Sequence, residues 1–226
     1  MLRPEGRVPL VKFLSRLETA PGAHETVAKG LSMKHSASRD LFAHWNERRG
    51  ARVLPERGEI EPAAIRAALG DTFILGAEPA EDLRFRLAGT RVCALFGREL
   101  KDEPFTALWD AGHHVAIRRL LAAVGEDEIG GVAGARARTP EGFSCDLELL
   151  LLPLRHRGRS GRRMLGALAP LAVPVWLGAS RLDPLSLSSL RYLADALEPA
   201  GPSRLAASLG REQARRDFVV YEGGRS

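Results

Sequence analysis

Two consecutive stretches of this 226-residue chain alternate between polar and apolar or small side chains, and they constrain its fold more than any other feature. Residues 130–138 are rich in glycine and alanine, with arginine and alanine alternating over 135–138, and in residues 143–149 phenylalanine, cysteine and leucine alternate with serine, aspartate and glutamate. A period of two residues is typical of a half-buried β-strand. The sequence Pro-Glu-Gly at 140–142 suits a tight turn between them. The pattern predicts an antiparallel hairpin, and the run after Leu149, apolar on both faces, predicts a strand at the centre of a sheet.

Two further strands are predicted before this hairpin. Residues 72–75 form an apolar, β-prone run, and residues 83–87 alternate strictly. The alternation in the second run directs Leu83, Phe85 and Leu87 to the core and leaves the intervening arginines in solvent.

Helices are predicted between these strands and the hairpin. Short helical segments are expected over residues 90–96 and 104–109, and the longest helix of the region follows Asp110. Four of its apolar residues recur at the spacing of one helical face, namely Ile117, Leu120, Leu121 and Val124. After the hairpin, a polar loop over residues 155–163 leads to a last strand over residues 164–169. This order predicts an α+β domain, an antiparallel sheet with short helices over one face.

The N-terminal part is predicted to add two helices. Ser38 suits the N-cap of a helix over residues 39–49, and a second short helix is expected over residues 61–69. Three residues of the first helix share one apolar face, namely Leu41, Phe42 and Trp45. Such a face packs either on the chain's own domain or on a partner as a dimer contact, and the sequence leaves both alternatives open.

These elements divide the chain into consecutive parts. The expected parts are an N-terminal extension over 1–37, the N-terminal helices over 38–71, the central domain over 72–170 and a C-terminal extension over 171–226. The first is expected to be flexible, with Met33 as a candidate for the natural start. In the last, a short helix is expected over residues 188–197, and Pro, Gly, Ser and Arg dominate from Glu198 onward, which predicts weak order.

Composition bears on the compartment and on charged partners. The net charge of +5 permits contact with acidic partners, although an Arg- and Ala-rich chain also reflects a GC-rich bacterial genome. Cys93 and Cys145 fit no zinc or CxxC spacing, so a reducing cytoplasm is expected. Residues 164–180 carry no charge, but prolines and glycines interrupt them, so we interpret them as a buried strand that continues into an apolar tail and not as a membrane span.

The order of motifs resembles a PAS domain. The resemblance rests on Gly89-Thr-Arg-Val-Cys-Ala-Leu-Phe-Gly97-Arg-Glu-Leu100, on the helix after it, and on the Thr139-Pro-Glu-Gly142 turn into residues 143–149. The chain most resembles the small PAS family found as short stand-alone proteins in bacteria. This resemblance extends over HSASRDLFAHWNERRG, ALGDTFILGAE and WLGASRLDPLSLSSLRYL. The resemblance implies a PAS-like domain over residues 72–170 that acts as a sensory or regulatory module. It implies binding of a small ligand or a protein partner, with the signal passed on by homodimerisation or by docking on a regulator.

The side chains predicted to point from these elements into the interior are assigned to the wall of an internal ligand pocket. They are Phe85, Leu87, Val92, Phe96, Trp109, His113, Ile117 and Leu147. Haem-binding PAS domains place their histidine on a comparable helix, and one neutral imidazole can hold haem iron; the alternative for His113 is a core-edge histidine bonded to a carbonyl. Cys93 lacks the Asn-Cys-Arg-Phe-Leu-Gln context of flavin-binding PAS domains, so neither haem nor flavin is assigned. Cys93 and Cys145 are expected to act as small core side chains.

A second class of function uses the basic loop Arg155–Arg163. A nucleic-acid-associated regulator would neutralise phosphates with such a loop. No aromatic residue interleaves to stack on bases, which favours a solvated loop and makes nucleic acid the less favoured partner. A Gly-rich phosphate loop, GxSxG and HExxH are absent from the sequence, so no enzyme is expected.

Overall fold

The computed structural model describes residues 33–77, 83–156 and 159–193, and these residues form one antiparallel sheet with helices on both faces. The sheet has six strands in the order β2-β1-β5-β4-β3-β6, and every neighbouring pair is antiparallel. The strands are β1 (Thr72–Gly76), β2 (Arg84–Ala88), β3 (Gly131–Arg138), β4 (Ser144–His156), β5 (Arg159–Pro170) and β6 (Ser186–Tyr192). The predicted α+β class with an antiparallel sheet is confirmed.

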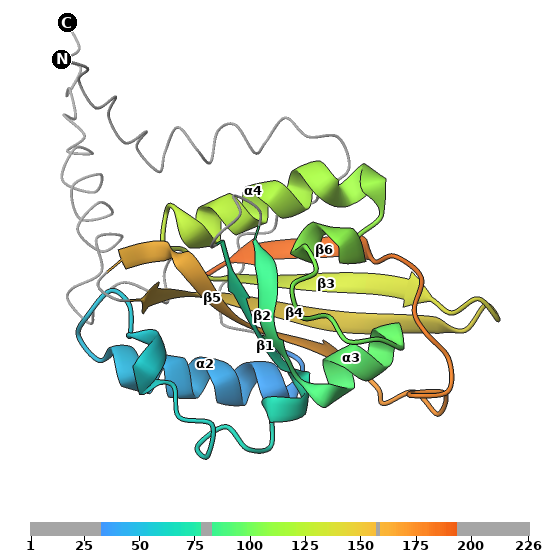
Figure 1. Ribbon diagram of the computed structural model, residues 1–226, viewed down its shortest axis with the longest axis horizontal. Coiled ribbons are helices and arrows are strands. Elements are labelled where there is room, and N and C mark those ends of the chain that lie inside the picture. Colours follow the sequence, from blue (N-terminus) through green and yellow to red (C-terminus); the bar gives the residue numbers. More distant parts are fainter. Residues whose placement is uncertain (1–32, 78–82, 157–158, 194–226) are drawn as a thin grey trace, which may run out of the picture.

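Three α-helices and four short 3-10 helices accompany the sheet in the described residues. The α-helices are α2 (Ser36–Arg49), α3 (Thr90–Phe96) and α4 (His114–Gly125). The 3-10 helices are η1 (Arg57–Glu59), η2 (Leu69–Asp71), η3 (Phe105–Leu108) and η4 (Ala111–His113). Figure 1 shows α4 and α2 on opposite sides of the sheet. We call the face under α3, η3 and α4 the inner face, and the face under α2 the outer face.

Strand β4 is the centre of the molecule. It lies between β5 and β3, and its leucines alternate between the two apolar clusters. Leu147, Leu149 and Leu151 belong to the inner cluster, whereas Leu150 and Leu152 belong to the outer one. A strand buried on both faces needs a continuous apolar run, which is why the sequence after residue 149 loses its alternation.

The predicted hairpin is present and joins β3 to β4. Arg138 pairs with Ser144, and the amide of Gly142 donates to the carbonyl of Thr139 at 2.8 Å. Gly142 has a φ of 91°, a conformation that other residues rarely adopt.

Strands β4 and β5 are longer than the sequence predicts. The polar residues 155–163 were expected to form a loop, but β4 continues to His156 and β5 already begins at Arg159. His156 pairs with Arg159, beyond an irregularity in the register after Leu154. Polar and small residues without an apolar period look like a loop in sequence, so the strand ends could not be recognised there.

The helix expected over residues 188–197 is wrong, and so is the expectation that residues 164–169 form the last strand. Residues 186–192 form β6, which pairs with β3 at the edge of the sheet. The register shifts between Gly134 and Ala135 of β3, which partner Ser189 and Leu187. This bulge places Leu187 and Leu190 on the same face although they are three residues apart, a spacing that imitates a helix.

The facing of Leu87 is also predicted wrongly, whereas that of Phe85 is confirmed. Phe85 is fully buried, but Leu87 is 48% exposed. Leu87 pairs with Ile74 and Phe85 with Leu75, so the register shifts at Arg86. One additional residue in a strand turns the following side chain to the opposite face.

The N-terminal helix begins earlier than predicted. His35, not Ser38, is the N-cap of α2, and its Nδ1 accepts the Ala37 amide at 3.1 Å. Ser38 is buried inside the first turn. The helix expected over residues 61–69 is a series of turns that ends in η2, with hydrogen bonds between residues three apart, such as the Ala68 amide to the Ile65 carbonyl.

The helices of the inner face follow the prediction more closely. Residues 90–96 form α3, and Gly97 ends it in the left-handed conformation with a φ of 62°. Asp110 accepts the amide of Gly112 and thereby caps η4, which leads directly into α4. Among the described residues, no helix has the length and apolar character needed to cross a bilayer. The predictions about residues 1–32 and 194–226 lie outside the described residues.

Candidate functional site

Most of the predicted pocket residues converge on the inner face of the sheet. Phe85, Val92, Phe96, Trp109, Ile117 and Leu147 all belong to one buried cluster, which we call the inner core. They come from β2, α3, the segment after η3, α4 and β4. The sequence therefore identified the correct layer for these residues.

Two predicted pocket residues lie outside this cluster. Leu87 is exposed because of the register shift at Arg86, as described above. His113 is half-buried at the end of η4 and is not a member of the inner core. Its neighbour His114 instead contacts the backbone, with Nε2 2.9 Å from the carbonyl oxygen of Trp109.

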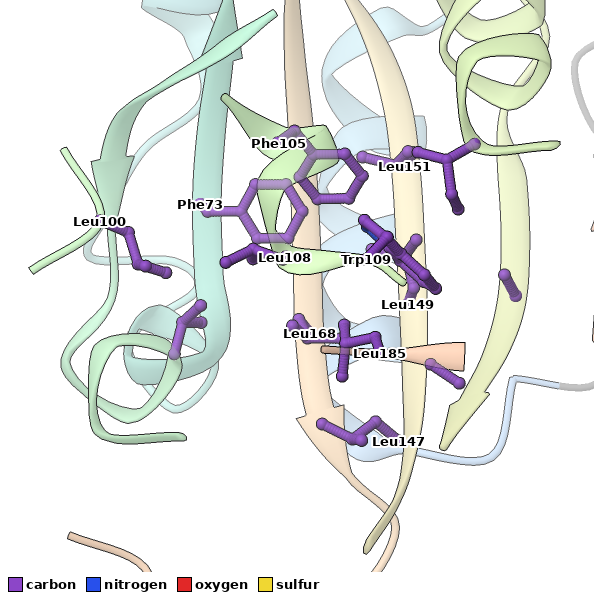
Figure 2. Packing of buried hydrophobic residues seen from close by; sticks show 14 of the residues in the cluster. Phe73, Leu100, Phe105, Leu108, Trp109, Leu147, Leu149, Leu151, Leu168 and Leu185 are labelled. Carbon is purple, nitrogen blue, oxygen red and sulfur yellow. The ribbon is translucent and has the colours of Figure 1, made fainter. Parts of the chain in front are cut away.

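Aromatic rings fill the middle of the inner core. The rings of Phe73 and Phe85 lie 5.4 Å apart in an edge-on arrangement, and Phe105 is 5.7 Å from each of them. Trp109 continues the series at 6.0 Å from Phe105. Figure 2 shows the rings of Phe73, Phe105 and Trp109 beside leucines of β4 and β5, such as Leu149 and Leu168. Offset and edge-on pairs at such separations stabilise an aromatic cluster.

The indole N–H of Trp109 is a polar group that this packing carries into the inner core. The residue is 2% exposed, and its backbone is fixed on both sides: its amide donates to Thr106, and it bridges to Leu185. Within the described residues Nε1 has no hydrogen-bond acceptor. A buried N–H without an acceptor costs about 1–3 kcal/mol. The sequence identified Trp109 as a wall residue but gave no signal for this donor.

Neither cysteine shows the features of a reactive thiol. Cys145 is buried in the inner core, and burial raises the pKa of its thiol. Cys93 packs against the edge of the same cluster and lies 3.5 Å from a carboxylate oxygen of Glu99. Burial, with a further contribution from this carboxylate, raises the pKa of Cys93. Raised values disfavour the thiolate, the reactive form, so both cysteines act as small apolar side chains.

The apolar face of the N-terminal helix packs on its own domain. Leu41 and Trp45 are fully buried in a cluster with leucines of β4 and β5, which we call the outer core. The Trp45 Nε1 donates to the carbonyl of Pro153 at 2.8 Å. Of the three residues expected at a partner contact, Phe42 alone stays half-exposed. The alternative of packing within the chain is therefore the observed one.

Glu148 fixes the start of this helix, and sequence reasoning did not find its role. Its carboxylate is 3% exposed and accepts the backbone amides of Lys34 at 2.7 Å and His35 at 3.0 Å. The residue belongs to the polar side of the predicted alternation, which suggested a solvent-facing glutamate. The segment before α2 covers that side instead.

Exposed apolar side chains follow the β3–β4 turn and the end of β5. Phe143 follows the β3–β4 turn, and Leu171, Val173 and Val175 follow β5. The Leu171 amide donates to the carbonyl of Asp146, which places the start of this segment beside the hairpin. Val173 is 73% exposed. The predicted apolar tail is therefore present after β5, and its apolar side chains lie on the surface.

The basic segment Arg155–Arg163, expected as a loop, comprises the end of β4 and the beginning of β5. Arg155 and Arg163 are half-buried, and the side chains between residues 157 and 162 lie outside the description. The Arg155 amide donates to the carbonyl of Pro55. Among the described residues no group of three or more His, Cys, Asp or Glu side chains has the arrangement of a metal site.

Comparisons with known proteins bear on the family. No curated protein matches the chain. A solved structure described as "Structure of an RNA-binding Light-Oxygen-Voltage Receptor" is similar at 15% identity with a TM-score of 0.35, and the match covers 64% of this chain and 35% of that chain. Residues 33–169, more than half of the chain, match the family described as PAS domain. The chain therefore belongs to the PAS-domain family, whose members are sensory and regulatory modules.

Proposed function

We propose that this protein is a PAS-type regulatory module that binds a small neutral ligand in its inner core and passes the signal to another chain by contact, without catalysing a reaction. The observation that carries this proposal is the indole N–H of Trp109, which is buried without an acceptor among the described residues. Such a donor is costly, and a ligand that brings an acceptor oxygen or nitrogen would remove that cost.

The surroundings of Trp109 indicate the chemistry of the ligand. Figure 2 shows the indole among Phe105, Leu149 and Leu151, all of them buried members of the inner core. A charged group in such surroundings would lose its hydration without gaining a partner. A compact, mostly apolar molecule with one carbonyl or similar acceptor fits this environment. Binding would require the packed aromatic side chains to move apart.

The experiment starts from the purified full-length protein. Native mass spectrometry and an absorbance spectrum detect a co-purified molecule, and a thermal-shift screen of small neutral carbonyl compounds covers the case of an empty protein. A ligand is expected to move the proton resonance of the Trp109 indole. Trp109→Phe should abolish binding, whereas Trp176→Phe, at the edge of the same cluster, should retain it. A protein that shows neither a mass excess nor a ligand-induced shift contradicts the proposal.

A second copy of this chain is the proposed recipient of the signal. The exposed apolar side chains of Phe143, Leu171, Val173 and Val175 support this, because large exposed apolar side chains are a feature of interaction surfaces. Residues 164–180 contain no charged side chain, so this segment itself adds no like-charge repulsion to a contact between two copies. Light scattering after gel filtration should show a dimer, and Val173→Asp with Val175→Asp should give a monomer. A wild-type monomer at every accessible concentration would instead direct the search to a separate regulator.

A reducing cytoplasm is the compartment that we propose. Cys93 and Cys145 are both free thiols in the structure, and burial protects the second. Oxidising compartments favour disulfide-stabilised domains. Fractionation of the native cell, with an antibody to this protein, tests the assignment.

A further inference from the structure

Histidine rings contact the backbone at three places in the described residues. In two of these contacts the ring accepts a hydrogen bond from an N–H group, and in the third it lies against a carbonyl oxygen. His35 and His44, both associated with α2, accept backbone N–H groups. His114 contacts a carbonyl oxygen. A neutral imidazole has one nitrogen that can accept, whereas the protonated ring has two donors and no acceptor. The first two contacts therefore require neutral histidine, and the third does not.

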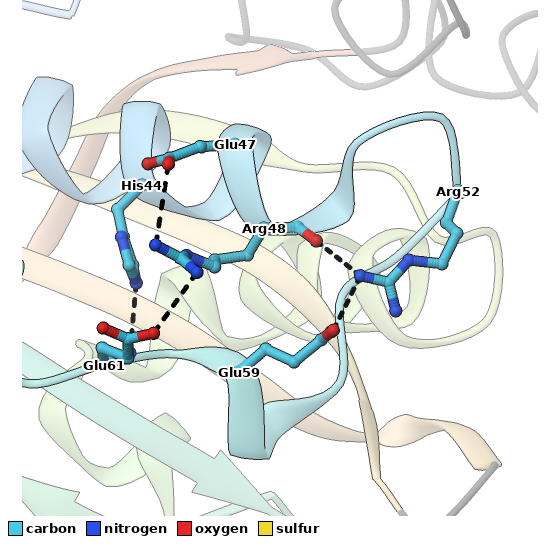
Figure 3. A network of polar contacts seen from close by, with 6 residues as sticks. All are labelled: His44, Glu47, Arg48, Arg52, Glu59 and Glu61. Carbon is cyan, nitrogen blue, oxygen red and sulfur yellow. Dashed lines mark hydrogen bonds and ion pairs between the residues drawn. The ribbon is translucent and has the colours of Figure 1, made fainter.

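His44 joins α2 to the segment that follows it. The side chain is 6% exposed, and its Nε2 accepts the backbone amide of Glu61 at 3.1 Å (Figure 3). The residues around Glu61 lead through turns to η2 and carry Ile65, which packs in the outer core with Leu41 and Trp45. Protonation of Nε2 would place its N–H opposite the N–H of Glu61, so the hydrogen bond would be lost. The segment around Glu61 would then be held less firmly to α2.

His35 holds the other end of the helix. As the N-cap residue of α2 it accepts the Ala37 amide through Nδ1, so its proton must lie on Nε2. Protonation of Nδ1 would remove the cap and place a positive charge at a helix N-terminus, where the helix dipole is unfavourable to cations. Loss of a cap of this kind weakens the first turn.

Neighbouring charges act on both rings and partly oppose each other. At His44 the nearby charges are Arg48 and the carboxylate of Glu61, which pair at 3.3 Å, while Glu47 contacts Arg48 at 3.6 Å. At His35 they are Glu148, Lys34 and Arg39. The oxygens of Glu148 already accept the amides of Lys34 and His35. Arg39 donates to the carbonyls of Met33 and Lys34. The carboxylates at both sites therefore already make contacts, and each protonated ring would also lie near at least one cation.

We propose that His35 and His44 make α2 a pH-operated cover of the outer face of the sheet. At neutral pH both rings accept backbone amides and α2 is seated; on mild acidification both bonds are lost and α2 with the segment around Glu61 loosens. The surface that α2 covers is apolar and includes Leu150, Leu152 and Leu165 of β4 and β5. Its exposure would offer a contact to another protein. Only this last step rests on the proposed function, since the loosening itself is a property of α2.

The wild-type protein tests the proposal directly. Nuclear magnetic resonance of the 15N-labelled full-length chain follows the Trp45 indole N–H and the Glu61 amide from about pH 8 to about pH 5.5, the range in which histidine changes charge. After correction for intrinsic exchange, protection of both groups should fall, by roughly fivefold for each hydrogen bond lost. The fall should follow the ring resonances of His35 and His44. Unchanged protection over this range overturns the proposal.

Matched variants separate these rings from other titrations. The substitutions His35→Asn and His44→Gln place a carboxamide oxygen near the positions of Nδ1 and Nε2 at every pH. The double variant should keep its protection on acidification. His114→Gln should behave like the wild type, because a donor to the Trp109 carbonyl survives either charge state. If the double variant loosens as much as the wild type, the two histidines are not the cause. The readout is independent of any ligand, so its failure differs from failure of the proposed function.

Discussion

The ring of Phe73 on β1 lies against the backbone of Gly166 on β5. The two residues are partners in the antiparallel register, and a Cβ atom placed on Gly166 would come within 2.2 Å of the ring atom Cζ. Phe73 in turn contacts Phe85 and Phe105. The absence of a side chain at residue 166 is therefore a condition for the aromatic packing of the inner core.

Gly166→Ala is expected to destabilise the fold by about 1–3 kcal/mol, as overpacking of a tight core usually does. Phe73 cannot move away without displacing the rings that surround it. Urea unfolding, followed by circular dichroism, measures the change. Gly58→Ala is the matched control, because a Cβ atom added to Gly58 would have nothing within 4 Å and the φ of this residue is not positive. Equal midpoints for the two variants would contradict this account.

Asp71 and Arg91 fix the start of α3 against η2. The Asp71 carboxylate is 2% exposed, and Arg91 binds both of its oxygens while also donating to the carbonyl of Ala67. Arg91→Ala is expected to cost about 2 kcal/mol, because it leaves a buried carboxylate without its partner although solvent can partly reach the site. Thermal unfolding should show the loss, while Arg118→Ala on the exposed side of α4 should not. The additional change Asp71→Asn should restore part of it, which a general effect of losing an arginine would not allow.

The sequence was most informative where one face of an element is buried. The hairpin β3–β4, the aromatic and aliphatic wall from Phe85 to Leu147 and the end of α3 at Gly97 follow from periodicity and from residue-specific backbone preferences. These signals are local, and the sheet preserves them because successive residues of a strand point to opposite faces. The PAS resemblance is confirmed by the family match over residues 33–169.

One error arises, and another position is hidden, where two strands shift relative to each other. The register shift at Arg86 exposes Leu87, and the shift opposite Gly134 places Leu187 and Leu190 of β6 on one face. A bulge is a property of a strand pair, so a single sequence contains little signal for it. The donor of Trp109 and the acceptor roles of His35 and His44 were missed for the same reason, since each depends on a contact made in three dimensions.

Acidification is expected to weaken the connection between α3 and η3. Arg98 donates two hydrogen bonds of 2.9 Å to Glu103, and these bonds lower the pKa of the Glu103 carboxyl from its ordinary value. A depressed pKa in the folded state gives a contribution to stability that is complete above the unfolded value of about 4.3 and is lost as pH falls through the folded value.

Arg98→Gln should therefore be less stable than the wild type near neutral pH, by less than about 1 kcal/mol for so accessible a pair. The difference should shrink as the pH is lowered from about 5 to about 3. Urea midpoints of both proteins at a series of pH values measure this, with Arg118→Gln as a control for the removed charge. A difference that stays constant over the whole series would show that the carboxyl of Glu103 is not the titrating group.

Trp45 anchors α2 to a carbonyl that the sheet leaves available. Residue 153 is a proline, so it contributes no N–H to the ladder. The first residue of β3, Gly131, pairs with Leu151, so β3 does not extend alongside Pro153. The carbonyl of Pro153 accepts a hydrogen bond from the Trp45 indole N–H instead, at 2.8 Å.

Trp45→Phe removes this bond and part of a fully buried side chain, which is expected to cost about 2–4 kcal/mol. Hydrogen exchange should increase along α2 more than in α4, because the lost contact holds α2 alone. Trp176→Phe, a half-buried tryptophan away from α2, should leave both helices protected; uniform loss of protection in Trp45→Phe would mean that the indole supports the whole domain and not the seating of one helix.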